Sequence, residues 1–258
     1  MSGRRPIVCG NWKMNLNHFE AIQTVQKTYW SLKPEHLRAV DVVVMAPFTD
    51  LRSVQTVIEN DSMGIGFGAQ NCHWEDAGAF TGEVSAAFLA KLNASHVIVG
   101  HSERRQMFGE TDETVARKVA AVLKHNMVPV ICVGETLDQH NEGQAVDVVS
   151  QQVRAALSGV GKVSGERLVF AYEPVWAIGA DQAASPDDVQ LMTGAIREVV
   201  GDVMGDAAAA EVRIQYGGAV DAGTAGKLIE IEDVDGFLVG RASLDPEAFA
   251  RIVAAIAV

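Results

Sequence analysis

The fold of this chain is first visible in residues 168–179, which read LVFAYEPVWAIG. The run at 168–171 is apolar throughout, as expected of a strand that a parallel sheet buries on both faces. Glu173 follows that run, and a carboxylate at the end of a buried strand is costly to desolvate, which predicts a raised pKa suited to a general base. Pro174 stiffens the loop that follows, and Trp176 and Ile178 suit a lid that closes over a site. We therefore interpret Glu173 as a base beneath a lid.

Runs of the same kind recur about every 30 residues, and a helical pattern follows each one, which is typical of repeated βα units. The eight runs are Ile7–Gly10, Val42–Ala46, Ile65–Ala69, Val97–Gly100, Pro129–Val133, Leu168–Ala171, Val212–Gln215 and Phe237–Val239. No linker, low-complexity segment or change of composition divides the chain. The sequence therefore predicts a single α/β domain over residues 1–258, a closed (β/α)8 barrel, for which a length of roughly 250 residues is usual.

Composition and charge exclude several classes of function. The chain has 258 residues and a formal net charge of −12, with no basic cluster that could follow a nucleic acid backbone. No apolar run approaches the ~20 residues of a membrane span. The cysteines Cys9, Cys72 and Cys132 are far apart, which argues against zinc and disulfides and favours a reducing compartment. We expect a cytoplasmic protein that binds neither nucleic acid nor membrane.

A barrel of this kind carries its catalytic groups in the loops at the carboxyl ends of its strands. Unusual residues fall at these positions in six of the eight predicted units: Asn11, Trp12 and Lys13; His101, Ser102 and Glu103; Glu135; Glu173; Gly217 and Gly218; and Gly240 and Arg241. They are the candidate site residues.

Two of these candidates have a plainer interpretation as well. Lys13 could meet an anionic substrate, but most lysines are simply on the surface. His101 stands where a helix begins, and the positive end of that helix should lower its pKa and keep the ring neutral, as an electrophile requires. The plainer alternative, a core histidine, describes His96 at the start of the same strand better than it describes His101.

Glycines at the last two strand ends predict a phosphate site. Gly217, Gly218 and Gly240 can expose backbone N–H groups to a phosphate, and the seventh and eighth loops of a barrel commonly form such a site. The alternative at each position is an ordinary tight turn. The glycines of residues 64–68 lie inside a predicted strand with no helix after them, so we interpret them as close backbone packing and not as a dinucleotide-binding loop.

Several motifs together resemble those of the triosephosphate isomerase family. They are residues 11–15 (NWKMN), 78–83 (GAFTGE), 99–105 (VGHSERR), 132–135 (CVGE), 171–179 (AYEPVWAIG) and 216–218 (YGG), which span nearly the whole chain in order. The resemblance implies a TIM barrel and the interconversion of dihydroxyacetone phosphate and D-glyceraldehyde 3-phosphate through an enediol, a step of glycolysis and gluconeogenesis. It implies a small phosphorylated sugar as the substrate, and neither a cofactor nor a metal.

The resemblance also implies a role for each site residue. Glu173 would move the proton, His101 would polarise the substrate oxygens, and Lys13, with Asn11 beside it, would stabilise charge. Glu103 would orient Lys13, and Ser102 would hold Glu173 while the lid is open. The residues that would bind the phosphate are Gly179, Ala219, Gly240 and Arg241. The residues that would take part in closing the lid are Pro174, Trp176, Glu135 and Tyr216.

The resemblance further implies a homodimer. The segment from Gln70 to Phe80, with Trp74, would insert beside the neighbouring subunit's site and bring Thr81 near Asn11 and Lys13. The alternative is that Trp74 and Phe80 belong to the core of their own chain. The choice between a dimer and a tetramer stays open.

Three loops depart from the family pattern, all on the phosphate side. The lid tip reads Gly179-Ala180-Asp181 in place of Gly-Thr-Gly, Ala219 replaces a serine, and Arg241 replaces a glycine. We expect Arg241 to face the phosphate and to offset the lost hydroxyl and the added carboxylate. An isomerase of a tetrulose phosphate in polyol catabolism is therefore an alternative function. A catalytically silent barrel used as a binding module is a remote one, because Asn11, Lys13, His101 and Glu173 are all present.

Overall fold

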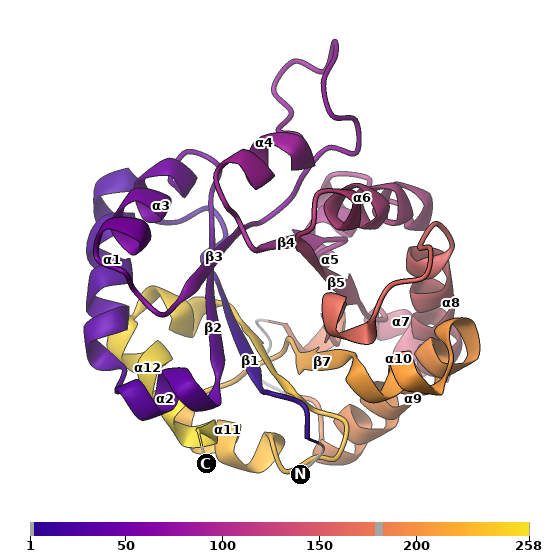
Figure 1. Cartoon of the computed structure of the whole chain (residues 1–258). Helices are drawn as coiled ribbons and strands as arrows, with labels where there is room; N and C mark the ends of the chain where they lie inside the picture. Colours follow the sequence, from indigo (N-terminus) through magenta and orange to yellow (C-terminus); the bar gives the residue numbers. More distant parts are fainter. Residues whose placement is uncertain (1–2, 179–182, 258) are drawn as a thin grey trace.

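The computed structural model describes residues 3–178 and 183–257, and its centre is a closed barrel of parallel strands (Figure 1). The strands follow one another round the barrel in chain order: β1 (Ile7–Asn11), β2 (Asp41–Ala46), β3 (Gly66–Ala69), β4 (His96–Val99), β5 (Val128–Val133), β6 (Val169–Tyr172), β7 (Arg213–Tyr216) and β8 (Gly236–Val239). Each strand begins and ends within one residue of its predicted run. The predicted (β/α)8 TIM barrel is confirmed.

Helices surround the barrel and cover its outer face (Figure 1). They are α1 (His18–Ser31), α2 (Pro34–Ala39), α3 (Leu51–Asn60), α4 (Ala86–Lys91), α5 (Ser102–Met107), α6 (Asp112–Lys124), α7 (Leu137–Asn141), α8 (Ala145–Leu157), α9 (Pro186–Met204), α10 (Asp206–Glu211), α11 (Ala222–Leu228) and α12 (Pro246–Ile256), with the short 3-10 turns η1 (Gly165–Arg167), η2 (Val175–Ala177) and η3 (Arg241–Leu244). In the described part, no helix is long and apolar enough to cross a membrane.

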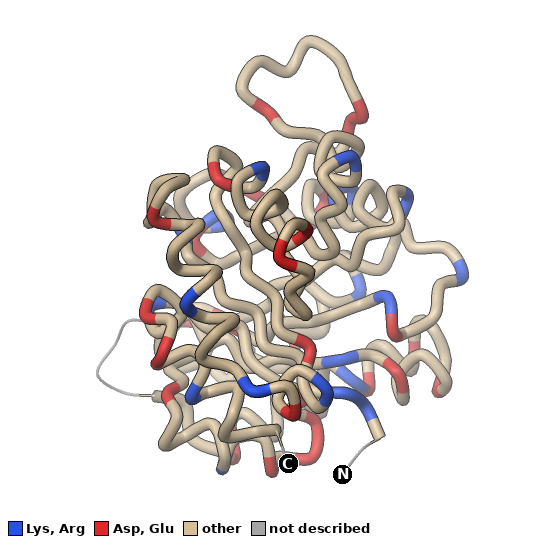
Figure 2. The backbone as a smooth tube through the Cα atoms, turned by 60° about the vertical axis from the view of Figure 1, so that its left-hand side comes forward, with Lys and Arg blue, Asp and Glu red and all other residues tan. Residues whose placement is uncertain are grey.

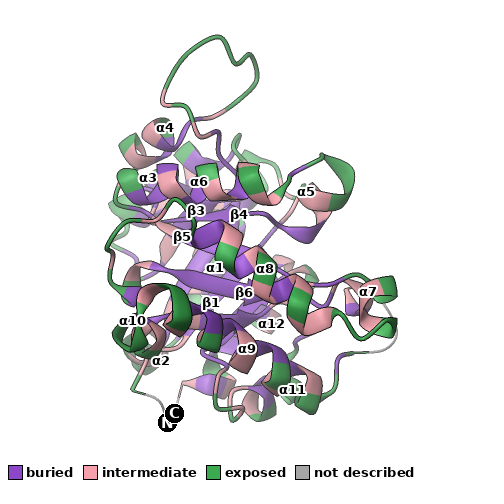
Figure 3. Ribbon diagram, turned by 90° about the vertical axis from the view of Figure 1, so that its right-hand side faces the viewer, coloured by how far each residue is buried: buried purple, intermediate pink, exposed green. Residues whose placement is uncertain are grey.

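Side chains alternate between two buried layers along each strand, because successive residues of a strand point to opposite faces. On β4, Ile98 packs in the cluster inside the barrel, whereas Val97 and Val99 pack in the outer cluster between strands and helices. Figure 3 accordingly shows the strands as largely buried and the longer helices as buried on one side. The strands are therefore the rigid base from which the loops at their ends project.

His96 lies on the inward face of β4, two residues before Ile98. Its Nδ1 atom is 2.8 Å from the hydroxyl of Ser95, but its Nε2 atom has no hydrogen-bond partner in the described part of the chain. Burial lowers the pKa of His96 to about 3. The predicted core histidine is confirmed, although only one of its two ring nitrogens is satisfied.

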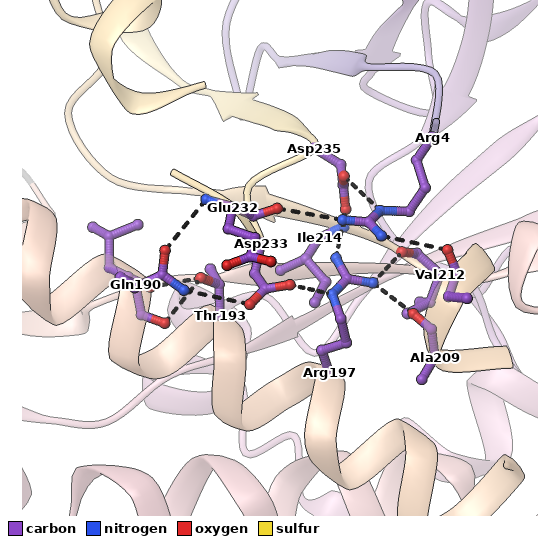
Figure 4. Close-up of polar contacts among 12 residues, drawn as sticks. Arg4, Gln190, Thr193, Arg197, Ala209, Val212, Ile214, Glu232, Asp233 and Asp235 are labelled. Carbon is purple, nitrogen blue, oxygen red and sulfur yellow. Dashed lines mark hydrogen bonds and ion pairs between the residues drawn. The ribbon is translucent and has the colours of Figure 1, made fainter. Parts of the chain in front are cut away.

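A network of arginines and aspartates links Arg4, near the start of the chain, to α9 and to the residues before β8 (Figure 4). Asp235, which precedes β8, accepts from Arg4 at 2.7 Å and from Arg197 of α9 at 2.8 Å. Arg197 also pairs with Asp233 at 2.5 Å, and Asp235 accepts the backbone N–H of Ile214. These contacts lie before β8 and at the start of β7, away from the carboxyl ends that bear the candidate site.

The connection between β3 and α4 protrudes from the molecule (Figure 1). Its charged residues Glu75, Asp76 and Glu83 are all acidic (Figure 2). No helix follows β3 directly, as predicted, and a side chain at Gly68 would meet the carbonyl of His96 at 2.3 Å. The interpretation of this glycine segment as close backbone packing is confirmed.

Candidate active site

Glu173 follows β6 at the carboxyl end of the barrel, and its side chain is almost fully buried. Its Oε1 atom lies 2.9 Å from the Nε2 atom of His101, and its Oε2 atom accepts the backbone N–H of Ser102 at 2.9 Å. His101 and Ser102 stand at the end of β4 and the start of α5. Two loops that are 71 positions apart in sequence thus meet at one carboxylate.

Hydrogen bonds define the protonation of the His101 ring. Its Nδ1 atom accepts the backbone N–H of Glu103 at 3.2 Å, which an unprotonated nitrogen alone can do. The ring proton is therefore on Nε2, where it faces the carboxylate of Glu173. A second proton, on Nδ1, would point at the backbone N–H of Glu103. Two donors would then face each other, and one of them would be buried and unsatisfied. This arrangement favours the neutral ring that the sequence predicted.

The reason given for that neutral ring was wrong. Burial lowers the pKa of His101, but the carboxylates of Glu173 and Glu103 raise it by more, so the net shift is upward while the pair is in contact. The helix that follows is only six residues long, so it supplies a weak dipole. The hydrogen bond to Nδ1, and not a lowered pKa, supports the neutral form.

The pKa predicted for Glu173 was also wrong for the observed arrangement. Burial raises the pKa of this carboxyl, as expected, but the contacts with His101 and with the Ser102 backbone lower it by more. Cys132, at the end of β5, contributes a further lowering hydrogen bond. The net pKa of Glu173 therefore lies below its usual value. The prediction failed because the sequence did not reveal these partners.

Lys13 is held at the site through three contacts. Its Nζ atom lies 2.5 Å from Oε1 of Glu103, its backbone N–H is bound by the Asn11 side chain, and its carbonyl accepts from Gln70. The backbone of Lys13 has a φ of 54°, which is uncommon for a residue with a side chain. The β1 loop is thus fastened to the ends of β3 and β4, and the predicted closeness of Asn11, Lys13 and Glu103 is confirmed.

The glycines after β7 have a packing role. A side chain at Gly217 would meet Cγ of Glu173 at 2.9 Å, and one at Gly218 would meet the hydroxyl of Tyr216 at 2.1 Å. These positions let Glu173 lie against the turn and let the ring of Tyr216 fold back over it. The chain bends at Gly218, and close packing accounts for the glycine at both positions.

The predicted phosphate residues lie beside this turn and at the start of η3. Ala219 and Arg241 are exposed, and a side chain at Gly240 would stand 3.7 Å from Cε of Lys13. Gly240 therefore adjoins Lys13, while Arg241 has no side-chain hydrogen bond or ion pair within the described residues. Gly179, Ala180 and Asp181 lie outside the described residues.

The first part of the predicted lid packs against the end of β5. Pro174 is buried, and η2 carries Trp176. The indole Nε1 of Trp176 donates to Oε1 of Glu135 at 2.6 Å, and the hydroxyl of Tyr172 donates to the same oxygen at 3.1 Å. Trp176 and Glu135, to which the resemblance assigns the closure of the lid, are thus in contact.

The predicted latch residue, Tyr216, lies near the far end of the lid. Burial raises the pKa of Tyr216 to about 12, and the backbone of Ala184 lowers it by a smaller amount. Ala184 is the second described residue after the lid tip. The Tyr216 hydroxyl is therefore neutral and available as a hydrogen-bond donor beside that segment.

Thr81 is exposed on the loop that follows β3, and none of its contacts in the described chain reaches Asn11 or Lys13. The two aromatic residues of this loop differ. Trp74 packs against the core of its own chain, with the Arg117 guanidinium 4.6 Å from its ring centre, whereas Phe80 is 42% exposed. The core alternative is thus correct for Trp74 and wrong for Phe80.

Sequence reasoning missed three residues of the site. Gln70 binds the carbonyl of Lys13, Cys132 contacts the base, and His140 of α7 lies beside Glu135 and Trp176. Cys132 and Gln70 stand at strand ends, which could have identified them, but nothing in the sequence marks His140. A cavity of about 420 Å³, lined by Cys132 and Gln152 among others, reaches Glu173 from the side of α8. Among the described residues, no group of His, Cys, Asp or Glu side chains is arranged to hold a metal ion.

Comparisons with known proteins agree with this geometry. Residues 6–256 match the family model described as "Triosephosphate isomerase". The chain is 51% identical to a triosephosphate isomerase of Corynebacterium efficiens and 49% identical to one of Mycobacteroides abscessus, in each case over 97% of this chain and 96% of the relative. It is also 49% identical to a triosephosphate isomerase of Corynebacterium glutamicum, over 97% of both chains.

Proposed function

The chain belongs to the triosephosphate isomerase family and has triosephosphate isomerase activity, and from this premise we propose that Glu173 is the base that moves the proton. The reaction interconverts dihydroxyacetone phosphate and D-glyceraldehyde 3-phosphate through an enediol. One observation carries the proposal: a buried carboxylate faces the Nε2–H of His101 at 2.9 Å, at the carboxyl ends of two barrel strands. An acid–base pair at this position suits proton transfer next to a carbonyl group.

Substrate binding changes the balance of pKa contributions at Glu173. While Glu173 is paired with His101, that contact and the Ser102 backbone hold its pKa below the usual value. A substrate oxygen that accepts the Nε2–H of His101 takes this partner away, which removes the largest contribution that lowers the pKa, while burial continues to raise it. Glu173 becomes a stronger base when the substrate is in place.

His101 and Lys13 act on the substrate oxygens. The neutral ring of His101 donates from Nε2, and the same separation from Glu173 removes the largest contribution that raises its pKa. The ammonium of Lys13 stabilises negative charge on the enediolate, which is the kind of electrostatic stabilisation that commonly contributes most to catalysis. Asn11 and Glu103 hold Lys13 in place.

An isotope experiment tests the role of Glu173. In D2O, the wild-type enzyme should place solvent deuterium on the carbon next to the carbonyl group of the product, because the proton passes through an exchangeable carboxyl. Glu173→Gln, which removes the base and keeps the shape, should lower kcat by about 10²–10⁴-fold. A wild-type product free of deuterium would contradict transfer of the proton through an exchangeable carboxyl.

The phosphate site is also a proposal. Gly240 adjoins Lys13, and Ala219 and Arg241 are exposed residues of the loops after β7 and β8, whose backbone N–H groups we propose as phosphate donors. Gly179, the fourth proposed donor, lies outside the described residues. The exposed guanidinium of Arg241 is free to turn toward a bound phosphate. Arg241→Gly should raise the inhibition constant of inorganic phosphate by about tenfold, the value of one hydrogen bond to a charged group. An unchanged constant would show that Arg241 does not contact the phosphate.

The lid consists of Pro174 to Trp176 and the tip that follows, with Glu135 as the acceptor for Trp176 and Tyr216 as the latch. Its closure excludes water, which strengthens the electrostatic contacts with the enediolate. The backbone N–H of Ser102 holds the carboxylate of Glu173 until the substrate binds and the carboxylate moves away.

We also propose that the enzyme is a homodimer. Large apolar side chains are exposed on segments that follow the neighbouring strands β1 to β4: Met14, Phe48, Phe80, Phe88 and Phe108. Exposed apolar surface of this extent marks protein contacts. The protruding loop would then bring Thr81 to the partner's Lys13. Sedimentation at micromolar concentration should give twice the mass of 27.6 kDa, and a monomer would contradict the proposal.

Residues 1–258 are proposed to act as one domain, and the enzyme is proposed to work in the cytoplasm. The three cysteines, Cys9, Cys72 and Cys132, are buried and free, which suits a reducing compartment.

A further inference from the structure

The carboxylate of Glu135 is completely buried where the lid meets β5. Its Oε1 atom accepts from the hydroxyl of Tyr172 at 3.1 Å and from the indole of Trp176 at 2.6 Å. The backbone carbonyl of Glu135 also accepts the N–H of Val175 at 3.2 Å. The first residues of the lid are therefore fastened to this one glutamate.

His140 also contacts both Glu135 and Trp176. Its Nδ1 atom lies 3.4 Å from Oε1 of Glu135, and the centre of its ring is 4.5 Å from that of Trp176 at an interplanar angle of 37°. His140 belongs to α7, whose N-cap Thr136 accepts the backbone N–H of His140 at 2.9 Å. The short helix thus holds the ring against both the carboxylate and the lid.

Few groups compensate the negative charge of Glu135. Burial and the nearby carboxylate raise the pKa of Tyr172, so the hydroxyl remains a neutral donor, as the indole is. Within the described residues, Oε2 of Glu135 has no hydrogen-bond partner, and His140 is the one residue that forms an ion pair with this carboxylate. A buried carboxylate is strongly destabilised unless a positive group compensates it.

The elements around His140 carry acidic residues. Asp138 and Glu142 flank His140 on its own segment, and Asp147 stands in the first turn of α8, which packs against α7. Asp188, in the first turn of α9, acts on Tyr172. All of these groups are acidic, and the side chain of His140 is 34% exposed, so it can exchange protons with solvent.

We propose that His140 is a positioning residue for the lid: its protonated ring binds Glu135 and packs against the ring of Trp176, and so favours the docked position of Trp176. Histidine ordinarily changes charge between pH 5 and 8, and a positive ring on an aromatic face is bound more strongly than a neutral one. Docking of the lid therefore weakens as the pH rises. The inference takes the lid role of Trp176 from the proposed function, but Trp176 can be observed without turnover.

The deciding experiment follows Trp176 by fluorine-19 NMR in the full-length enzyme labelled with 5-fluorotryptophan. The chain has four tryptophans, and the resonance absent from Trp176→Phe identifies the one required. Between pH 5.5 and 8.5, we expect this resonance to move through one titration step. In His140→Phe, which keeps an aromatic ring without charge, the step should be absent. In His140→Arg, the resonance should stay near its acidic position throughout.

A matched control is His36→Gln, on α2 and away from the lid. In this variant the Trp176 resonance should change with pH as it does in the wild type. A Trp176 resonance that does not titrate in the wild type, or that titrates equally in His140→Phe, overturns the proposal. Either result would leave the isomerase activity untouched, so failure of this inference is distinct from failure of the proposed function.

Kinetics supply a second readout that a purely structural role of His140 would not move. The ratio of KM in His140→Phe to KM in the wild type should be about threefold at pH 6 and near one at pH 8, with kcat changed less than KM. Comparison at the same pH cancels the titration of the substrate phosphate. A ratio that is equal at both pH values overturns the proposal.

Discussion

At the residue scale, Lys13 has a backbone conformation that its side chain disfavours. A φ of 54° costs roughly 1–2 kcal/mol in a residue other than glycine. Asn11, Gln70 and Glu103 hold the residue in this conformation through its N–H, its carbonyl and its ammonium. Strain of this kind persists where surrounding contacts enforce it, often at functional sites. We conclude that the conformation serves to aim the ammonium into the site.

Replacement of Lys13 tests this conclusion. Lys13→Met keeps the length and removes the charge, so kcat/KM on glyceraldehyde 3-phosphate should fall by about 10²–10³-fold, as for other groups that stabilise developing charge. Glu103→Gln keeps the ammonium of Lys13 but removes its ion pair, so kcat/KM should fall by less than in Lys13→Met. Lys27→Met, on the exposed side of α1, is the control and should behave like the wild type. Equal rates in Lys13→Met and Lys27→Met would remove Lys13 from the mechanism.

The clustering of the candidate site residues could be predicted from the sequence, whereas the directions of the pKa shifts of Glu173 and His101 could not. Glu173, His101 and Lys13 stand at strand ends, and a barrel brings such positions together. The pKa of Glu173 depends on His101, on the Ser102 backbone and on Cys132, which are distant from it in sequence. A local pattern reveals that a carboxyl is buried but does not reveal its partners.

At the scale of elements, the bend after β7 brings the proposed latch, Tyr216, close to the proposed base, Glu173. Tyr216 folds over Gly218, and Glu173 packs against Gly217, so both glycines are needed for close approach. The hydroxyl of Tyr216 lies beside Ala184, at the end of the lid. A change at Gly218 should therefore act on the lid without touching a proton-transfer group.

Gly218→Ala introduces a methyl group that would overlap the Tyr216 ring, with contacts of 2.1 Å to the hydroxyl and 2.3 Å to Cζ. We expect the ring to move and kcat/KM to fall by about tenfold or more, because misplacement of a closing element by about 1 Å can cost 10²-fold. Gly161→Ala is the matched control, since a side chain there meets nothing within 4 Å. Retention of wild-type kinetics in Gly218→Ala, measured beside Gly161→Ala, would show that Tyr216 does not latch the lid.

The regular elements could be predicted more fully than the loops. Apolar runs such as Ile7–Gly10 defined every strand to within one residue, because a strand buried on both faces has a continuous signal. The loop after β3 has no such signal. Its residues Trp74 and Phe80 took opposite environments, one against its own core and one exposed, and only tertiary packing decides between them.

At the scale of the whole molecule, His96 makes the stability of the barrel depend on pH. Its pKa in the folded protein is about 3, because the barrel interior disfavours the charged ring. The unfolded chain binds a proton at this position near pH 6.5, whereas the native barrel binds one only near pH 3. Stability is therefore complete above pH 6.5 and is lost as the pH falls from 6.5 toward 3.

His96→Leu should remove this part of the pH dependence. Between pH 7.5 and pH 5, the wild type should lose about 2 kcal/mol more of its free energy of unfolding than the variant, since each pH unit below 6.5 contributes up to about 1.4 kcal/mol. Urea unfolding at a fixed protein concentration measures the difference, with His36→Gln as the histidine control. Equal losses in the wild type and in His96→Leu would mean that the interior accommodates the charged ring.

The central claim is that this barrel isomerises a triose phosphate through Glu173, and one measurement tests it most directly. We would determine kcat/KM on glyceraldehyde 3-phosphate and on a four-carbon ketose phosphate, for the wild type and for Glu173→Gln. The account predicts a triose value near the diffusional ceiling of ~10⁸–10⁹ M⁻¹s⁻¹, far above the four-carbon value and lost in Glu173→Gln. A weak triose rate beside a stronger four-carbon rate, or a triose rate that survives in Glu173→Gln, would contradict it.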